Sequence, residues 1–241
     1  MCYATSLTKK RKLLEEILQR GFIYPEEYEP LYYVNGFEHT NLNIIKMDDA
    51  EKIYPASWGL VPEWGQDDVA AFHKKYNTLN AKQETALRSR MYEESTRERR
   101  CLILADGFFE PHHEGKDRIP YYCYVPSETQ EDGRELFLFA GIYTELDDEK
   151  YSCSIFTTEA NDFFAEVHNN RKRMPLVMDE HYFEDWLDPD MNDQMIDELL
   201  STGFTTKEFA AHPVNRSLYK RGGNKNVPES IQEFRESDLF S

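Results

Sequence analysis

Cysteine is scarce in this chain, and long apolar runs are absent. The 241 residues include four cysteines, Cys2, Cys101, Cys123 and Cys153, which lie far apart and form no C-x-x-C pair. This spacing argues against a zinc ribbon and a disulfide framework, and the three later cysteines, unlike Cys2, are expected to be buried within strands. The longest apolar runs, such as residues 136–142, are much shorter than the roughly 20 residues of a membrane-spanning helix. With no secretory signal apparent, we expect a cytoplasmic protein without membrane contact.

Positive charge is also in short supply. Lys and Arg number 28 against 45 Asp and Glu, so the formal net charge is -17. A charge of this sign repels polyanions at long range and argues against a general nucleic-acid coat. A composition with 40% hydrophobic and 14% aromatic residues nevertheless indicates a folded chain.

Short apolar segments indicate a mixture of strands and helices. Strands are expected at residues 31–34, 42–47, 101–105, 121–125, 136–143 and 151–157, after a short extended piece at 2–6. Helical patterns occur at residues 9–20, 81–94, 160–167, 180–187 and 193–200. Because the strands cluster instead of alternating strictly with helices, we predict an α+β fold with mainly antiparallel pairing. No linker divides the chain, so residues 1–241 are expected to form a single domain.

Cys2 is the first candidate for chemistry. Removal of Met1 would expose an α-amine and a thiol on adjacent carbons, which titrate at about 8 and about 8.5. Such a 1,2-aminothiol can capture an aldehyde as a Schiff base and close a thiazolidine ring. Alternatively, the thiol can attack an acyl carbon as in N-terminal-nucleophile hydrolases. Position alone favours an ordinary small apolar residue that opens a strand, so other residues must decide.

Other segments contain residues that could act with Cys2. Trp58 and Trp64 bracket a Gly and a Pro, and would stack on bases if exposed or anchor a loop if buried. Asn80 stands at an expected helix start, where an N-cap is the simplest explanation. Glu110 follows two phenylalanines, and its desolvation would raise its pKa toward neutrality and suit it to proton transfer.

His168 precedes three consecutive cations at residues 171–173. If the fold brings it together with Cys2 and Glu110, a nucleophile and acid/base groups share one site. The adjacent His112 and His113 lack metal-ligand spacing and are interpreted as loop polarity. No metal, nucleotide or flavin cofactor is indicated.

The ordered motifs resemble the SRAP family, the SOS response-associated peptidase or abasic-site processing proteins. After Met-Cys come W-G-L-V-P-x-W, N-A-K-x-E-T, D-G-F-F-E, A-G-I-Y and R-M-P-L-V-M, spread over nearly the whole chain. The resemblance implies an antiparallel, barrel-like core with peripheral helices. It also implies covalent capture of abasic sites in single-stranded DNA through the N-terminal cysteine, in the response to DNA damage.

The resemblance assigns roles to matching positions. Cys2 is the nucleophile that forms the thiazolidine, Asn80 positions the cysteine or the sugar, and Glu110 is the acid/base group. His168 assists the proton transfers, and the cations that hold phosphates are Lys82 and Arg173.

The chain departs from the family pattern at four places. Tyr3 and Ala4 replace the usual Gly-Arg after the cysteine, Lys82 replaces an arginine, and Pro111 replaces a tryptophan. His168 precedes Arg173 by five residues where two are usual. Residues 169–172 therefore either form an enlarged loop or displace His168 from the site.

Three functions stay open at this point. The first is a monomeric protein that crosslinks abasic single-stranded DNA, with a possible lyase side reaction. The second is an N-terminal-cysteine peptidase, perhaps acting only on its own N-terminus, and the third is a non-catalytic module whose aromatic loop stacks bases. Residues 174–206 hold nine acidic residues and no Lys or Arg, whereas cations gather at 82–100, 171–173 and 216–225. We therefore expect one basic face with modest, salt-sensitive affinity for a short stretch of DNA.

Overall fold

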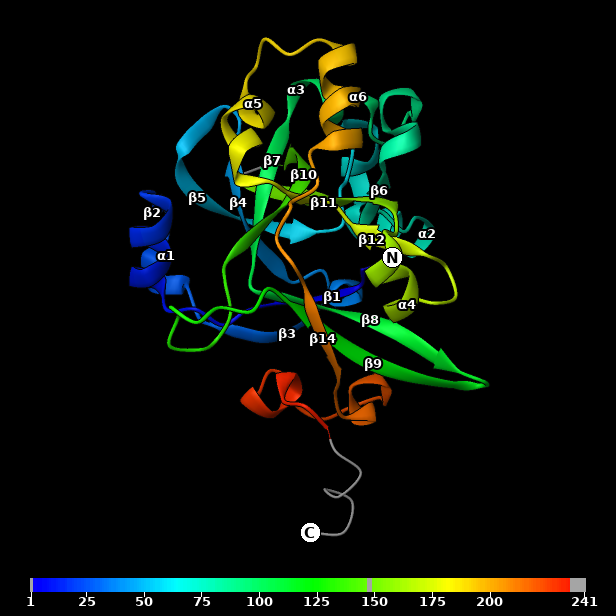
Figure 1. Ribbon diagram of the computed structural model, residues 1–241. Helices are drawn as coiled ribbons and strands as arrows, with labels where there is room; N and C mark the ends of the chain where they lie inside the picture. Colours follow the sequence, from blue (N-terminus) through cyan, green and yellow to red (C-terminus); the bar gives the residue numbers. More distant parts are fainter. Residues whose placement is uncertain (1, 147–148, 235–241) are drawn as a thin grey trace.

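The computed structural model describes residues 2–146 and 149–234 (Figure 1). Its strands are β1 Ala4–Leu7, β2 Gly21–Phe22, β3 Leu31–Asn35, β4 Asn41–Lys46, β5 Asp49–Trp58, β6 Asn80–Lys82, β7 Arg100–Ala105, β8 Gly107–Glu114, β9 Asp117–Tyr124, β10 Phe137–Leu146, β11 Lys150–Glu159, β12 Arg173–Pro175, β13 Val177–Met178 and β14 Ala210–Pro213. Its α-helices are α1 Arg11–Leu18, α2 Val69–Lys75, α3 Glu93–Glu98, α4 Asp162–Val167, α5 Phe183–Leu187 and α6 Asp193–Thr202. Short 3₁₀ helices include η2 Gly36–Glu38, η4 Gln83–Arg88, η6 Arg216–Tyr219 and η7 Pro228–Ile231. Within the described ranges, no helix has the length and apolar character needed to cross a bilayer.

The strands form two sheets. The smaller has the order β14-β9-β8-β1-β3 and is antiparallel throughout. The larger follows the path β12-β11-β10-β7-β4-β5-β2, and a parallel contact between β5 and β11 closes β11, β10, β7, β4 and β5 into a ring. The predicted α+β class with a barrel-like, mainly antiparallel core is confirmed.

Both faces of the ring sheet are buried, and successive residues of its strands pack on opposite sides. Ile44 of β4 and Ile103 of β7 belong to the cluster that contains Cys2. Their neighbours Ile45 and Leu104 belong to a second cluster with Trp186 of α5. Since side chains alternate along a strand, two apolar environments require continuous apolar runs, which is why the motif in β7 reads Cys-Leu-Ile-Leu-Ala.

Asp106 joins the two sheets, because it is the one residue between the end of β7 and the start of β8. Its buried carboxylate accepts hydrogen bonds from the Ser6 hydroxyl at 2.7 Å and the Thr8 amide at 2.7 Å. The Tyr122 hydroxyl lies 3.0 Å from that of Ser6. This network fixes the course of β1 next to the junction between β7 and β8.

Several elements differ from the sequence prediction. The expected helix at 81–94 is wrong, since this segment holds the end of β6, the 3₁₀ helix η4 and the start of α3. The strands β5 and β8 were not predicted, and His112 and His113 lie in β8 and not in a loop. The other predicted strands and helices are confirmed with shifted ends.

Replacing Gly107 by alanine is expected to destabilise the junction. A Cβ built there lies 2.1 Å from the Tyr122 hydroxyl oxygen, and Tyr122 is itself buried in the Ser6 network. We expect Gly107→Ala to lower the free energy of unfolding by about 2 kcal/mol or more, measured by urea titration. Gly21→Ala is the matched control, because a Cβ there meets no atom within 4 Å. Equal stability of the two variants would contradict this account.

Candidate active site

The pairing of β1 with β8 places Cys2 next to Glu110. Ala4 lies opposite Phe109 in the antiparallel register. Cys2 lies two residues before Ala4, and Glu110 directly follows Phe109, so both reach the same end of the strand pair. Each is fully buried, at 0% exposure. The structure thus brings together the two residues that the sequence analysis places at the centre of the chemistry.

The Cys2 thiol lies in an apolar environment. Its Sγ donates to the carbonyl oxygen of Ala4 at 3.4 Å, and Val34 and Phe108 belong to the same buried cluster. Burial first, and then the charge of Glu110, raises the pKa of the Cys2 thiol well above its usual value. The thiol is therefore protonated at neutral pH, and a reaction at Sγ requires a base. The expectation that Cys2 differs from the other cysteines in not being buried is wrong.

Asn80 holds the backbone of Cys2. Its Nδ2 donates a hydrogen bond of 2.8 Å to the Cys2 carbonyl oxygen. Asn80 reaches this position from β6, where it lies opposite Ile155 of β11 in a parallel pairing. An N-cap role is therefore wrong. The Asn80 Oδ1 is buried and accepts no hydrogen bond from the part of the chain that the structure describes.

Glu110 and His168 form a buried pair. His168 Nδ1 lies 3.1 Å from Glu110 Oε2 and 3.0 Å from the carbonyl oxygen of Arg173. A carbonyl only accepts, so Nδ1 carries the proton and the Nε2 of a neutral ring keeps its lone pair. Burial raises the pKa of Glu110 to about 7 and lowers the pKa of His168 to about 4. Near neutrality, Glu110 thus exchanges between acid and carboxylate beside a neutral imidazole.

The altered spacing between His168 and Arg173 is absorbed by a loop. Lys172 adopts a left-handed conformation with φ of 48°, and its amide donates to the His168 carbonyl oxygen at 3.1 Å. The side chain of Asn169 binds the backbone of His113 in β8. Residues 169–172 therefore loop outward while His168 keeps its contact with Glu110.

The two predicted phosphate-binding cations differ in their surroundings. Lys82 is exposed at the end of β6. Arg173 is mostly buried and makes two hydrogen bonds to the carboxylate of Glu84, at 2.7 Å and 3.1 Å, and one to the carbonyl oxygen of Thr157. A phosphate would have to share or replace Glu84 to bind Arg173.

The two tryptophans of the aromatic loop have different environments. Trp58 is fully buried, and its Nε1 donates to the carbonyl oxygen of Leu79 at 2.8 Å, so it anchors the loop. Trp64 is 43% exposed, with the guanidinium of Arg90 5.2 Å from its ring centre. Of the two, only Trp64 has a surface on which a base can stack.

The described residues include no cluster of three or more His, Cys, Asp or Glu side chains suited to hold a metal ion. Met1, whose removal the sequence analysis expects, lies outside the described residues.

The ring sheet, the antiparallel second sheet and the buried Cys2–Glu110–His168 site define a mixed α+β protein with an N-terminal cysteine centre. The chain belongs to the SRAP family, SOS response associated peptidase, whose model matches residues 1–220. It is 28% identical over 224 residues to abasic site processing protein YoqW of Bacillus subtilis, covering 91% of this chain and 93% of that protein. It is 28% identical over 226 residues to abasic site processing protein YedK of Escherichia coli, covering 90% and 94%.

A solved structure supports the fold assignment. The crystal structure of a protein from Bacteroides thetaiotaomicron matches with a TM-score of 0.82 and 28% identity, over 97% of this chain and all of that one. A protein from Bordetella bronchiseptica, 18% identical, matches with a TM-score of 0.68 over 89% of this chain and all of that one and shares the fold. The predicted family is confirmed.

Replacing Glu110 by glutamine should change how stability depends on pH. The folded pKa of about 7 exceeds the ordinary value of 4.5, so between these values the folded state holds a proton that the unfolded state has released. Stability is therefore lost as pH rises through this window. Glutamine does not titrate, so the free energy of unfolding of Glu110→Gln, relative to that of the unchanged protein, should rise by on the order of 2 to 3 kcal/mol between pH 5 and pH 8.

The measurement is urea unfolding of both proteins at pH 5 and pH 8. The exposed Glu51 supplies the control, because Glu51→Gln should show the same difference from the unchanged protein at both pH values. A Glu110→Gln difference that does not change with pH would show that Glu110 ionises as it does in water.

Proposed function

We propose that this protein captures abasic sites in single-stranded DNA by forming a thiazolidine between Cys2 and the ring-opened sugar. The observation that carries the proposal is that buried Cys2, whose backbone is bound by the Asn80 amide, lies next to the buried Glu110–His168 pair. Membership of a family whose relatives are named abasic site processing proteins supports the choice of substrate.

The reaction requires a free α-amine on Cys2, and therefore loss of Met1. The amine adds to the C1′ aldehyde of the open sugar, and loss of one water gives a protonated Schiff base. Sγ then adds to the same carbon as the thiol proton leaves, and the C=N electron pair returns to nitrogen. The product is a five-membered ring, and the net reaction releases one water.

Glu110 suits both proton transfers. As an acid it can protonate the sugar ring oxygen during opening, and as a carboxylate it can take the proton of the thiol whose pKa it raises. His168 orients Glu110, because its Nδ1 donates to the Arg173 carbonyl oxygen at 3.0 Å and lies 3.1 Å from Glu110 Oε2. The Schiff base also acidifies the adjacent sugar carbon, so strand cleavage by β-elimination is an expected side reaction.

A thiol peptidase is the second candidate, since the family description includes that activity. In this case Cys2 attacks a peptide carbonyl and Glu110 or His168 acts as the base. The raised pKa of the thiol favours the aldehyde reaction, because attack on an amide needs a reactive thiolate. Turnover of a fluorogenic peptide panel that depends on Cys2 would favour the peptidase.

Changing Cys2 to alanine should abolish the stable crosslink. The purified protein is incubated with single-stranded DNA containing one abasic site, and adducts are separated on a denaturing gel. Cys153→Ala is the matched control, since Cys153 is another fully buried thiol in the same apolar cluster. Intact-mass measurement on the same samples establishes whether Met1 is absent.

Two results would reject the covalent proposal. One is a stable adduct of unchanged yield with Cys2→Ala. The other is no adduct from protein whose mass shows that Met1 has been removed. If Cys2→Ala leaves every measurable function intact, the protein is instead a non-catalytic binding module.

Changing Asn80 to alanine should slow crosslinking by roughly tenfold or more, because the Cys2 backbone loses the hydrogen bond that orients it. The readout is the single-turnover rate at saturating abasic DNA. Asn41→Ala, which changes an exposed amide on β4, should leave this rate unchanged. An unchanged rate with Asn80→Ala would assign the amide a purely structural role.

A further inference from the structure

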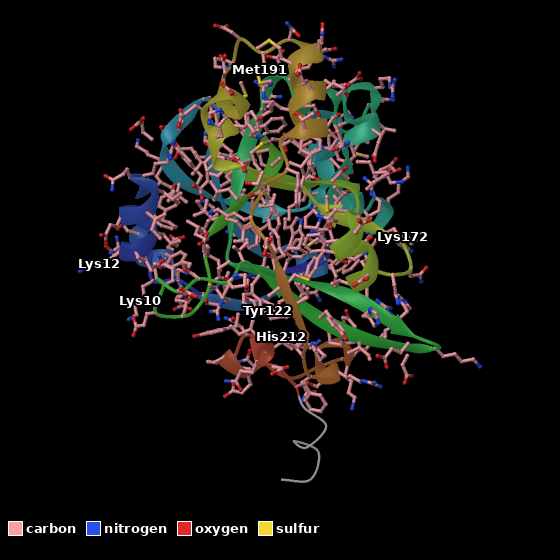
Figure 2. All side chains as sticks on the ribbon, in the orientation of Figure 1. Lys10, Lys12, Tyr122, Lys172, Met191 and His212 are labelled. Atoms are coloured by element: carbon pink, nitrogen blue, oxygen red, sulfur yellow. The ribbon has the colours of Figure 1, made fainter. Side chains whose placement is uncertain are left out.

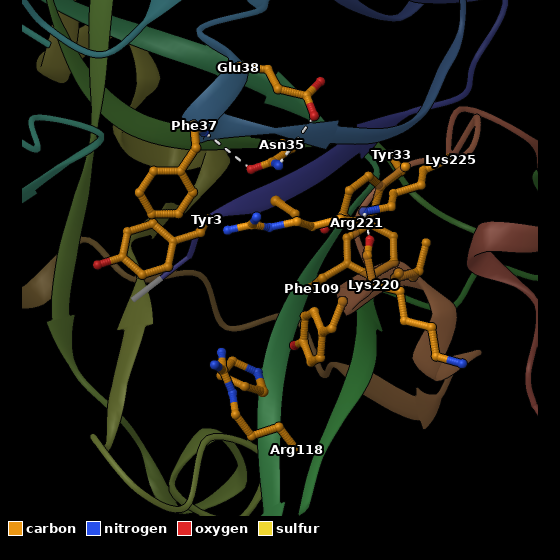
Figure 3. A pocket seen from close by; sticks show the side chains of 15 residues that line it. Tyr3, Tyr33, Asn35, Phe37, Glu38, Phe109, Arg118, Lys220, Arg221 and Lys225 are labelled. Atoms are coloured by element: carbon orange, nitrogen blue, oxygen red, sulfur yellow. Dashed lines mark hydrogen bonds between the residues drawn. The ribbon is translucent and has the colours of Figure 1, made fainter. Parts of the chain in front are cut away.

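A pocket of about 400 Å³ opens beside the active site (Figure 3). Tyr3 and Pro111 line it, and these residues directly follow Cys2 and Glu110 in the chain. Its other walls come from β1 and β3, from η2, from Phe109 of β8 and Arg118 of β9, and from residues 218–222 and 225 near the C-terminal end of the described chain. None of these residues belongs to a motif that carries the family resemblance except Phe109.

One side of the pocket is an exposed aromatic platform. Phe37 of η2 is 58% exposed, and its ring centre lies 5.0 Å from that of Tyr3, with the two planes tilted by 38°. The platform is held in place, because the Gly36 amide donates to the Tyr3 carbonyl oxygen at 2.9 Å. The side chain of Asn35 also accepts a hydrogen bond from the Phe37 amide at 3.2 Å. A fixed, solvent-facing ring is what stacking on a nucleobase requires.

The remaining walls of the pocket carry positive charge. Its lining contains four cations and a single carboxylate, that of Glu38; the cations are Arg118, Lys220, Arg221 and Lys225. The pocket lining is therefore positively charged, although the whole chain has a net charge of -17. The pocket therefore attracts anions, whereas the negatively charged remainder of the protein repels them.

Two of the four cations, Lys225 and Arg118, lie against aromatic rings of the pocket. Lys225 Nζ donates to the Lys220 carbonyl oxygen at 2.7 Å and lies 5.9 Å from the ring centre of Tyr33. The guanidinium of Arg118 lies 5.2 Å from the ring centre of Tyr219. Lys220 and Arg221 are exposed, so their charges are open to a ligand in the pocket.

We propose that this pocket binds a nucleotide adjoining the abasic site, with its base stacked on Phe37 and its phosphates bound by Lys220 and Arg221. Rings and cations in one pocket match the alternating bases and phosphates of a single strand. The inference rests on the proposed function, because the occupant is the strand whose damaged sugar reaches Cys2. It adds a phosphate contact from residues 220 and 221 to a chain that has Ala4 where the family pattern usually has an arginine.

The charge contact is tested by Lys220→Ala/Arg221→Ala. The matched control, Lys10→Ala/Lys12→Ala, removes the same charge from exposed residues at the start of α1, which Figure 2 labels and which do not line the pocket. Binding is measured by fluorescence anisotropy of undamaged single-stranded DNA, and crosslinking by single-turnover kinetics with abasic DNA.

The pocket variant should need roughly tenfold more DNA for half-saturation in both assays, and its log affinity should fall less steeply with log salt, by about 1.4 for two phosphates. The loss should appear in half-saturation and not in the rate at saturating DNA. The same change in the Lys10/Lys12 control, or no change in the pocket variant, would overturn the proposal.

The stacking contact is tested at Phe37. Phe37→Ala should raise the half-saturating DNA concentration at least about fivefold, whereas Phe37→Tyr keeps a ring and should restore binding. Because the pocket lies on one side of Cys2, extending abasic DNA on one side of the lesion should matter more than extending it on the other. An equal gain in affinity from both extensions would reject a nucleotide pocket on one side of Cys2. Tighter binding of a poly-glutamate peptide than of DNA would also reject the proposal.

The two proposals fail separately. If undamaged DNA binding depends on Lys220, Arg221 and Phe37 but no covalent adduct forms, the pocket stands and covalent capture is wrong. If a Cys2-dependent adduct forms with no dependence on these residues, covalent capture stands and the nucleotide pocket is wrong.

Discussion

The antiparallel pairing of β1 with β8 is the constraint on which the site depends. Cys2 has no chemical partner unless the N-terminal strand enters the smaller sheet beside Glu110. That entry is fixed by Asp106, which joins β7 of the ring sheet to β8 and binds Ser6 and Thr8 of the N-terminal segment. The D-G-F-F-E motif therefore combines two tasks: Asp106 and Gly107 fix the strand, and Glu110 provides the proposed acid/base group.

Burial gives the site its reactivity. In a low-dielectric interior each ionisable group favours its neutral form, so the thiol pKa rises, the Glu110 pKa rises to about 7 and the His168 pKa falls to about 4. Between about pH 4 and pH 7 all three groups are predominantly neutral. In this pH range, a charge on any of these three side chains arises mainly when a proton is transferred during a reaction. In the proposed reaction, burial would disfavour both the Glu110 carboxylate and a protonated Schiff base nitrogen, so proton transfer between them would be more favourable than with a solvated carboxylate.

Sequence patterns predicted four of the five ring strands, β4, β7, β10 and β11, and the raised pKa of Glu110, because both depend on local apolar composition. They did not predict β6, where Asn80 is held by parallel pairing with β11, some 75 residues further along the chain. Local propensity favoured a helix there, and a long-range contact overrode it. The position of His168 was equally undecidable, since the outward turn at Lys172 depends on contacts with β8.

The pocket residues gave no sequence signal for a related reason. Phe37 stands in an ordinary Gly-Phe-Glu turn, and its significance lies in an exposure of 58% beside Tyr3, which only the fold reveals. The cluster at 216–225 was visible as charge and was expected to adjoin the proposed site, but the pocket that it shares with Phe37 was not predicted. The order of motifs along the chain identified the family, whereas the neighbours of each side chain had to come from the structure.

The charge distribution would limit how tightly the protein holds DNA before the proposed covalent step. The acidic segment at 174–206 includes α5 and α6, which lie at the opposite end of the molecule from η6 and η7 in Figure 1. A strand approaching the pocket is therefore attracted locally and repelled by the distant end, and salt weakens both effects. We expect such binding to be modest and reversible, which would let the protein leave intact DNA. The proposed covalent capture would make weak binding sufficient, because a bond formed only with an aldehyde would provide the retention that non-covalent contacts need not supply.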